Sequence, residues 1–265
     1  MSLDVSLNLP PGTLRDPGCP VWVEEALSRH GIAPKRLTLE LLENGEIDAK
    51  TMDQAIDRLV AIGVKLSMDD LGSGFSSLQR LVTLPFDSIK VDQGLLKRIR
   101  TAPLHTISMI GTIVRMGQDF ERDVVVEGLE DRAMVEAAAI LGAPYGQGYS
   151  LARPMPAPQV AQWLRDFRLP ISPGEVTTAL GGLSFHRWIH AANSDIRRPT
   201  LEACPLTRYF SRLGESAAEG AHLHARIHES GPGDSSFKDL TFWLVEQIRK
   251  EQEAFVKGQN SGTEK

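Results

Sequence analysis

Two adjacent carboxylates, Asp69 and Asp70, directly follow a short apolar run and could hold divalent cations. Neighbouring carboxylates repel each other unless a cation lies between them, and a bridging carboxylate commonly holds two ions about 3.5 to 4 Å apart. Two such ions activate water and stabilise the charge that develops during phosphodiester cleavage. The pair therefore points to metal-assisted hydrolysis of a phosphate ester.

Further oxygen ligands occur at the ends of other apolar runs. Asn8, Glu40 and Glu127 extend the aspartate pair to a set of amide and carboxylate oxygens from four strands, which suits Mg²⁺ or Mn²⁺ better than zinc. A single Asp or Glu at a strand end has a simpler explanation, because such residues often cap the following helix. The whole set favours a site for two divalent ions.

Lys90 lies in the run Ile89-Lys90-Val91-Asp92. Successive side chains of a strand point to opposite faces, so Lys90 faces inward if Ile89 and Val91 face the covering helices. A buried lysine among carboxylates is costly unless it has a function. We therefore expect a catalytic role for Lys90 rather than a plain ion pair.

Short β-rich runs alternate with helix-period segments up to residue 168, a pattern typical of a parallel sheet covered by helices. The expected strands are Val5–Asn8, Leu37–Leu42, Val64–Met68, Ser88–Val91, Val124–Val126 and, less clearly, Tyr145–Tyr149. The expected helices are Val21–His30, Asp48–Ile62, Ser76–Val82, Leu104–Met116, Arg132–Leu141 and Gln159–Phe167.

An open sheet and a barrel both fit this alternation. Five strands that each offer polar groups at the same end favour a ring, because an open sheet gathers its ligands at one switch point. A closed barrel of this class needs eight strands. The fold expected is thus α/β, a TIM-like (β/α) barrel lacking its first two strands.

After the barrel segment, 1–168, and a Pro/Gly linker, 169–176, the β-rich runs cease. Residues 177–257 predict a small all-α helical bundle, and the polar residues 258–265 predict a disordered tail. The expected helices are Thr177–Ala192, Leu201–Leu213, Ala217–Glu229 and Phe237–Val256, with a core that includes Trp188, Phe237, Phe242 and Trp243.

The bundle also carries a candidate metal site. His186 and His190 are four residues apart, as are His224 and His228, so each pair lies on one helix face. Either of the first two, with Cys204, His224 and His228, could form a closed tetrahedral zinc site. Histidines on helix surfaces are common, and an unmetallated bundle fits the same pattern.

Composition excludes several classes of protein. The net charge of −5 argues against binding a nucleic acid polymer, no stretch approaches the length of a membrane span, and the N-terminus lacks a signal peptide. The two cysteines, Cys19 and Cys204, make a disulfide framework improbable. We expect a cytoplasmic protein.

Six motifs resemble, in order and spacing, the EAL-type cyclic di-GMP phosphodiesterases of bacteria. The similarity covers essentially residues 4–168. The strings are LNLP (7–10), LELLE (39–43), DDLGSGFSSL (69–78), LPFDSIKVD (84–92), VVVEGLED (124–131) and APYGQGYSLARPMP (143–156).

The resemblance implies a TIM-like barrel that cleaves cyclic di-GMP to linear pGpG with two divalent cations. It assigns Asn8, Glu40 and Asp69 to one metal, and Asp69, Asp70 and Glu127 to the second. Lys90 is expected to position the attacking water and stabilise charge. The other motif residues with expected support roles are Glu43, which braces the loop after the aspartate pair, Asp92, Glu130, and Gln147, which lines the site.

The chain departs from the family because it begins after the Glu-Ala-Leu signature, whose glutamate is a metal ligand. We therefore expect an active parent protein with upstream sensor or cyclase domains, a homodimer, and weak or no activity of this segment alone. Two alternatives stay open. One is a non-catalytic cyclic di-GMP sensor. The other is a zinc or redox sensor in the helical segment, which loosely resembles the zinc-binding domains of bacterial chemoreceptors.

Overall fold

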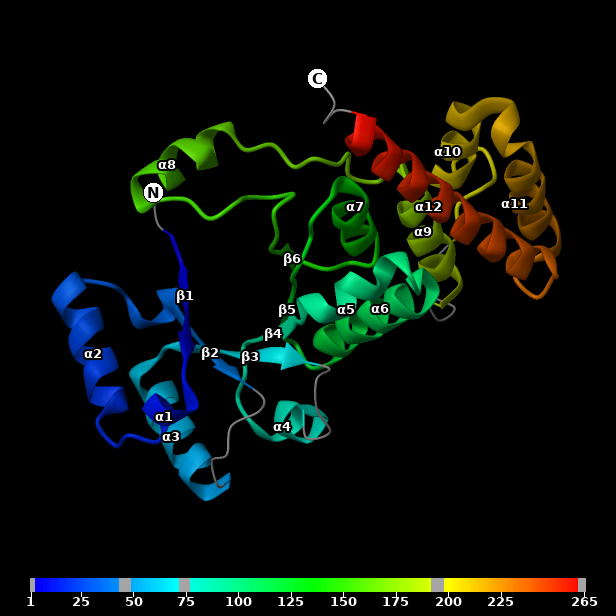
Figure 1. The fold of residues 1–265 in the computed structure, drawn as a ribbon. Coiled ribbons are helices and arrows are strands. Elements are labelled where there is room, and N and C mark those ends of the chain that lie inside the picture. Colours follow the sequence, from blue (N-terminus) through cyan, green and yellow to red (C-terminus); the bar gives the residue numbers. More distant parts are fainter. Residues whose placement is uncertain (1–2, 43–48, 72–76, 192–197, 262–265) are drawn as a thin grey trace. The chain divides into compact units, whose positions relative to one another are not determined.

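The computed structural model describes residues 3–42, 49–71, 77–191 and 198–261; for 49–51, 77–79, 190–191 and 255–261 it describes the backbone alone. The strand order in the sheet follows the chain, β1-β2-β3-β4-β5-β6, and from β1 to β5 each strand pairs with the next in parallel (Figure 1). The strands are β1 Val5–Leu9, β2 Leu37–Leu42, β3 Lys65–Leu71, β4 Ser88–Val91, β5 Asp123–Val126 and β6 Tyr145–Gly146.

Helices follow the strands, as expected from the alternation. They are α1 Pro11–Leu14, α2 Cys19–His30, η1 Pro34–Arg36, α3 Ala49–Ile62, α4 Ser77–Thr83, α5 Gln93–Lys97, η2 Arg98–Arg100, α6 Pro103–Asp119, α7 Arg132–Ile140 and α8 Ala157–Asp166. This confirms the α/β, TIM-like fold with six strands. The sixth is shorter than predicted, because the segment Tyr145–Tyr149 contains two glycines, which weaken a strand.

Alternation of side chains explains how the strands face. In β2, Leu37, Leu39 and Leu41 are buried, whereas Thr38 and Glu40 point to the opposite face. Ile89 and Val91 of β4 are fully buried in the same way, which leaves Lys90 on the face that carries the polar groups. The predicted inward orientation of Lys90 thus follows from the burial of its two neighbours.

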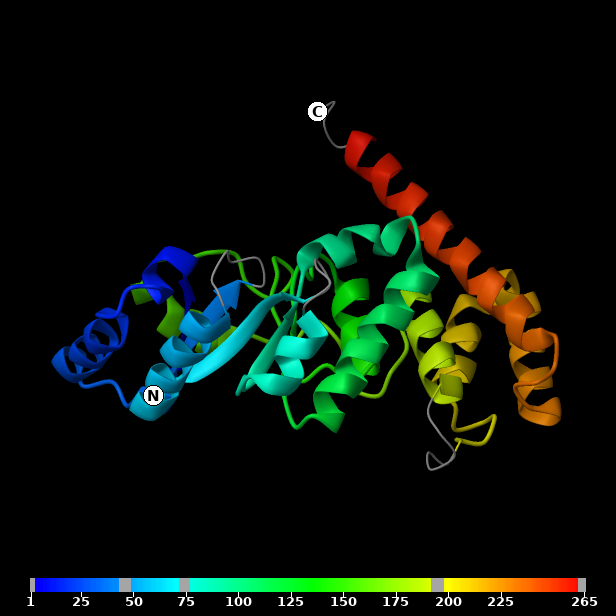
Figure 2. The same cartoon turned by 90° about the horizontal axis from the view of Figure 1, so that it is seen from below.

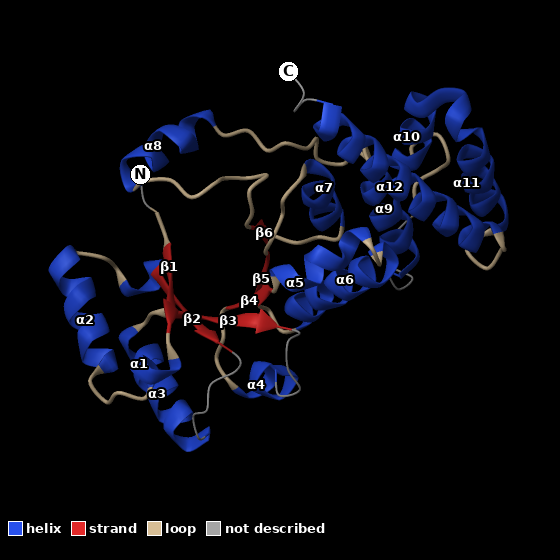
Figure 3. Cartoon of the chain, viewed as in Figure 1, coloured by secondary structure: helices blue, strands red, loops and turns tan. Residues whose placement is uncertain are grey.

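After α8 the described chain is helical, and Figure 3 shows this change from alternating strands and helices to helices only. The small all-α segment predicted here is confirmed. Its helices are α9 Ala179–Ala191, α10 Pro205–Leu213, η3 Gly214–Ala217, α11 Ala218–Ser230 and α12 Ser236–Ser261.

The core of this helical segment forms where α12 packs against α9 and α11, as Figure 2 shows from below. Leu240, Leu244 and Ile248 recur every fourth residue and form the buried face of α12. The prediction that Phe242 belongs to the core is wrong: the residue is 69% exposed, because its position falls on the opposite face of α12. The helix also continues to Ser261, past the expected start of the tail at residue 258.

The described chain divides into two units, residues 1–92 with 115–127, and residues 93–114 with 128–265. This division runs through the barrel segment, so the domain boundaries expected at residues 168 and 177 stay predictions. Within the described residues, no helix combines the length and apolarity needed to cross a bilayer. The expected cytoplasmic location stays a prediction.

Candidate active site

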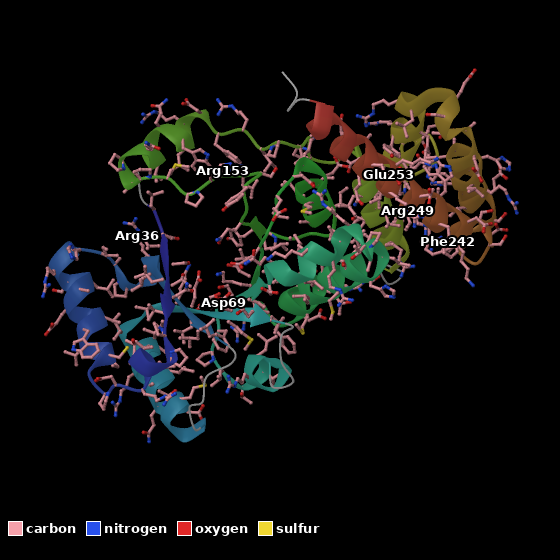
Figure 4. The ribbon with its side chains drawn as sticks, in the orientation of Figure 1. Arg36, Asp69, Arg153, Phe242, Arg249 and Glu253 are labelled. Carbon is pink, nitrogen blue, oxygen red and sulfur yellow. The ribbon has the colours of Figure 1, made fainter. Side chains whose placement is uncertain are left out.

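Lys90 lies at the centre of three carboxylates on the sheet. Its Nζ is 2.6 Å from Oε2 of Glu40, 2.6 Å from Oε1 of Glu127 and 3.3 Å from Oδ1 of Asp69. Lys90 and Asp69 are buried, and the side chains of Glu40 and Glu127 are mostly covered. Asp69, which Figure 4 labels in β3, is therefore joined by residues of three other strands or strand ends.

Strand register places Asn8 beside Glu40. Asn8 of β1 pairs with Glu40 of β2 in a parallel ladder, so their side chains lie on the same face of the sheet. Asp87 fixes β4 beside β3, because its Oδ2 accepts from the Leu66 amide at 2.8 Å and its own amide donates to the Leu66 carbonyl at 2.8 Å. Sequence analysis missed this role of Asp87.

The aspartate pair has an unusual backbone. Asp70 has a φ of 60°, the ladder between β3 and β4 shifts register between Met68 and Leu71, and the Asp70 amide donates to Oδ1 of Asp69 at 3.1 Å. A bulge of this kind re-aims side chains, and the Asp70 carboxyl group interacts electrostatically with Asp69, Asp92 and Lys90. Burial and the neighbouring Asp69 charge raise the pKa of Asp70 above its ordinary value.

The charges of the cluster are coupled. Burial lowers the pKa of Lys90, but hydrogen bonds to Glu127 and Glu40 outweigh it, so the net pKa is raised and the ammonium stays charged. Burial also raises the pKa of Glu127, although its hydrogen bond to Lys90 opposes this shift. A surplus of carboxylates around one cation suits a site that takes up further positive charge as hard divalent ions.

The structure places the residues with expected support roles differently. Asp92 follows β4 and interacts with the Asp70 carboxyl group. Glu43 lies outside the described residues. Glu130 and Gln147 are exposed and belong to the second unit, so their roles stay predictions.

A second cluster occurs in the helical segment. Cys204 precedes α10, His224 and His228 lie one turn apart on α11, and the ligand atoms of the three lie within 4.8 Å of one another. The Nε2 atoms of the two histidines are 3.1 Å apart. Burial raises the pKa of the Cys204 thiol, and burial with Arg198 lowers the pKa of His228.

The first histidine pair fits this cluster less directly. His186 is buried and its Nε2 lies 3.1 Å from both the Phe237 carbonyl oxygen and Thr241 Oγ1, so this nitrogen already has polar partners within the bundle. His186 lines the same cavity as Cys204, His224 and His228, about 460 Å³ in volume. The side chain of His190 lies outside the described residues.

Sequence analysis also missed Glu136, a carboxylate in α7 that is 1% exposed. It is the one charged residue in the run Ala133–Leu141, where an amphipathic helix is expected to bury only apolar side chains. A single charged residue within an apolar run was the feature of the sequence that could have indicated a buried carboxylate.

The family model described as "EAL domain" matches residues 1–154. A bifunctional diguanylate cyclase/cyclic di-GMP phosphodiesterase, MucR of Pseudomonas aeruginosa, is 36% identical over 139 residues, 52% of this chain and 20% of that protein. The cyclic di-GMP phosphodiesterase RocR of the same species is 32% identical over 155 residues, 58% of this chain and 39% of that protein. The chain thus spans well under half the length of either relative.

A solved structure of the MucR phosphodiesterase in complex with cyclic di-GMP aligns with a TM-score of 0.56 at 34% identity, covering 59% of this chain and 64% of that one. BlrP1 of Klebsiella pneumoniae, solved with manganese and cyclic di-GMP, aligns with a TM-score of 0.52 at 29% identity, covering 57% of this chain and 39% of that one. Both alignments support the fold of the barrel segment.

Proposed function

Because the chain belongs to the EAL domain family, we propose that its barrel segment binds cyclic di-GMP and hydrolyses it to linear pGpG with two divalent cations. The observation that supports this proposal best is the convergence of Glu40, Asp69 and Glu127 on Lys90, from separate strands or strand ends. A cyclic dinucleotide bound by MucR and BlrP1 supports the choice of substrate.

The residues of the cluster divide into two proposed ligand sets. Asn8, Glu40 and Asp69 would hold one ion, and Asp69, Asp70 and Glu127 the other. When bound, Mg²⁺ or Mn²⁺ ions activate a water molecule and stabilise the charge of the phosphodiester in the transition state. The manganese in the BlrP1 complex supports this choice of ions.

Lys90 is the proposed catalytic cation. Its ammonium has three N–H donors, and its contacts with Glu40 and Glu127 hold it among the proposed ligands. From this position it can donate a hydrogen bond to the attacking water or to a phosphate oxygen. A fixed positive charge in a water-poor site stabilises developing negative charge more than the same charge does in bulk water.

The proposal is tested by incubating cyclic di-GMP and Mn²⁺ with this chain, and with a chain lengthened at its N-terminus to include the Glu-Ala-Leu segment. We expect pGpG from the longer chain and little or none from this one. The Asp69→Asn variant of the longer chain should be inactive. Activity that survives this substitution would contradict the two-metal mechanism, and nucleotide binding without any cleavage would support a sensor instead.

We also propose that the helical segment binds zinc through Cys204, His224 and His228, with His186 or His190 as the fourth ligand. The observation that favours this is the convergence of three nitrogen and sulfur donors within 4.8 Å. Such donors form closed, tetrahedral structural zinc sites. A zinc or redox sensor beside the barrel could adjust its activity; the homodimer and the upstream domains stay predictions.

A further inference from the structure

Glu136 of α7 receives an unusual set of hydrogen bonds for a buried carboxylate. The amides of Thr177 and Thr178 donate to Oε1 at 2.8 and 3.0 Å, the Thr178 hydroxyl donates to Oε1 at 3.0 Å, and the Thr177 hydroxyl donates to Oε2. These threonines directly precede α9, which begins at Ala179. A side chain of the barrel segment thus binds the two residues that lead into the first helix of the helical segment.

This arrangement depends on charge and on space. Thr177 and Thr178 stand at the positive end of the α9 dipole, where a carboxylate is favoured. Within the first turn, the Ala179 amide donates to Glu251 and the Gly181 amide to the Thr178 hydroxyl. Gly181, in the first turn of α9, faces the same carboxylate, and a Cβ atom at this position would overlap Oε1 of Glu136. The close packing of α7 on α9 therefore needs both Glu136 and Gly181.

The same linker is held from α10. Arg212, in the last turn of α10, donates to the Val176 carbonyl at 2.7 Å, one residue before the threonines. Cys204 of the proposed zinc site stands at the other end of α10. A displacement of α10 would therefore be transmitted through Arg212 to Val176 and to the neighbouring threonines that Glu136 binds.

On its other side, α7 is fixed to the loop 128–131. Asp131 caps α7 by accepting from the Met134 amide at 2.9 Å and also pairs with Arg100 at 2.9 Å. Glu127 directly precedes this loop in the chain. The loop that α7 holds is therefore the segment that follows Glu127 in the chain.

We propose that Glu136 is a positioning residue that joins α9 to α7, so that the helical segment restrains the loop after Glu127. The hydrogen bonds by which Glu136 joins the two helices, called the joint below, exist whether or not the protein is catalytic. Its consequence for cyclic di-GMP cleavage rests on the proposed function.

The test is amide hydrogen exchange of the full chain, for wild type, Glu136→Gln and Ile227→Val. Glutamine keeps the size of the side chain but removes its charge and places an NH₂ group among donors. Ile227 is buried in α11, and its variant loosens the bundle without touching the joint. We expect faster exchange in residues 177–183 and 128–140 of Glu136→Gln, and unchanged exchange in 128–140 of Ile227→Val.

Faster exchange in residues 177–183 of Glu136→Gln with unchanged exchange in 128–140 would overturn the proposal, as would equal effects of both variants on 128–140. If Glu136→Gln does not fold, Thr177→Val removes one hydroxyl donor to Glu136 and keeps the charge of the carboxylate, and the same pattern is expected at smaller size. In the longer, active chain Glu136→Gln should lower kcat by several fold with Mn²⁺ affinity unchanged. If the wild-type form of that longer chain does not cleave cyclic di-GMP, the proposed function is refuted, whereas the hydrogen-exchange result is unaffected.

Discussion

The Lys90 ammonium lies 2.6 Å from a carboxylate oxygen of Glu127, the residue that directly follows the neighbouring strand β5. The same ammonium contacts Glu40 and Asp69. One lysine therefore neutralises part of the carboxylate cluster. The stability of the sheet and the metal affinity of the cluster should consequently be linked.

Lys90→Met should reduce the free energy of unfolding in EDTA by about 3 kcal/mol, because removing one partner of a buried ion pair leaves the others uncompensated. Mn²⁺ should stabilise this variant more than it stabilises wild type, since the ions then supply the missing charge. Urea denaturation with and without Mn²⁺ measures both effects. Lys97→Met, at an exposed position of α5, is the control, and equal stability of the two variants would argue against the linkage.

Asp69→Asn should weaken Mn²⁺ binding by more than about 100-fold, because even the loss of a residue that only orients a ligand costs 10 to 100-fold. Asp69 is the one residue assigned to both ions, so the stoichiometry should fall as well. Titration calorimetry with Mn²⁺ measures both quantities. Asp53→Asn, at an exposed position of α3, should bind as wild type does; equal binding by Asp69→Asn would remove it from the ligand set.

Cys204→Ser and His228→Ala should each lose most of the zinc that the wild-type chain holds after dialysis, because a closed site needs all of its ligands. Elemental analysis gives the stoichiometry, and the absorption spectrum of the Co²⁺ form reports a thiolate ligand. His222→Ala is a matched control, because His222 lies exposed on the same helix. Wild-type zinc content in Cys204→Ser would rule out the proposed site.

Gly148→Ala should destabilise the second unit by about 3 kcal/mol, since an added methyl in a packed site forces the backbone to shift. A Cβ atom at Gly148 would overlap the backbone of Leu129, whose amide donates to the Gln147 carbonyl at 3.1 Å. Thermal unfolding measures the loss. Gly233→Ala, where a Cβ atom meets nothing within 4 Å, should leave the midpoint almost unchanged; similar midpoints for both variants would refute the tight packing of this loop.

The sequence predicted the strands well, because strands follow from local rules; the ligand and catalytic roles of the clustered residues stay predictions. The flanking Ile89 and Val91 indicated the inward face for Lys90, and the structure shows the same alternation for Glu40 between leucines of β2. Parallel strands bring their carboxyl ends to one edge, so residues far apart in the chain could be grouped without coordinates.

Tertiary contacts were the part that local rules could not supply. Phe242 is apolar but lies on the exposed face of α12, and only the packing partners of that helix decide which face is buried. For Glu136 the situation is reversed, because a charged residue is buried. Its hydrogen-bond donors are two threonines some forty residues later in the chain. The residues near Glu136 in the sequence do not predict those hydrogen-bond donors.

The most direct test of the two-metal cluster is Mn²⁺-dependent binding of cyclic di-GMP, measured by calorimetry on this chain and on Asp69→Asn. We predict that wild type binds the nucleotide in Mn²⁺ and loses it in EDTA, and that Asp69→Asn shows no binding in either buffer. Equal binding by both proteins, or binding that EDTA leaves unchanged, would contradict the assignment of the cluster as a cation site for a cyclic dinucleotide.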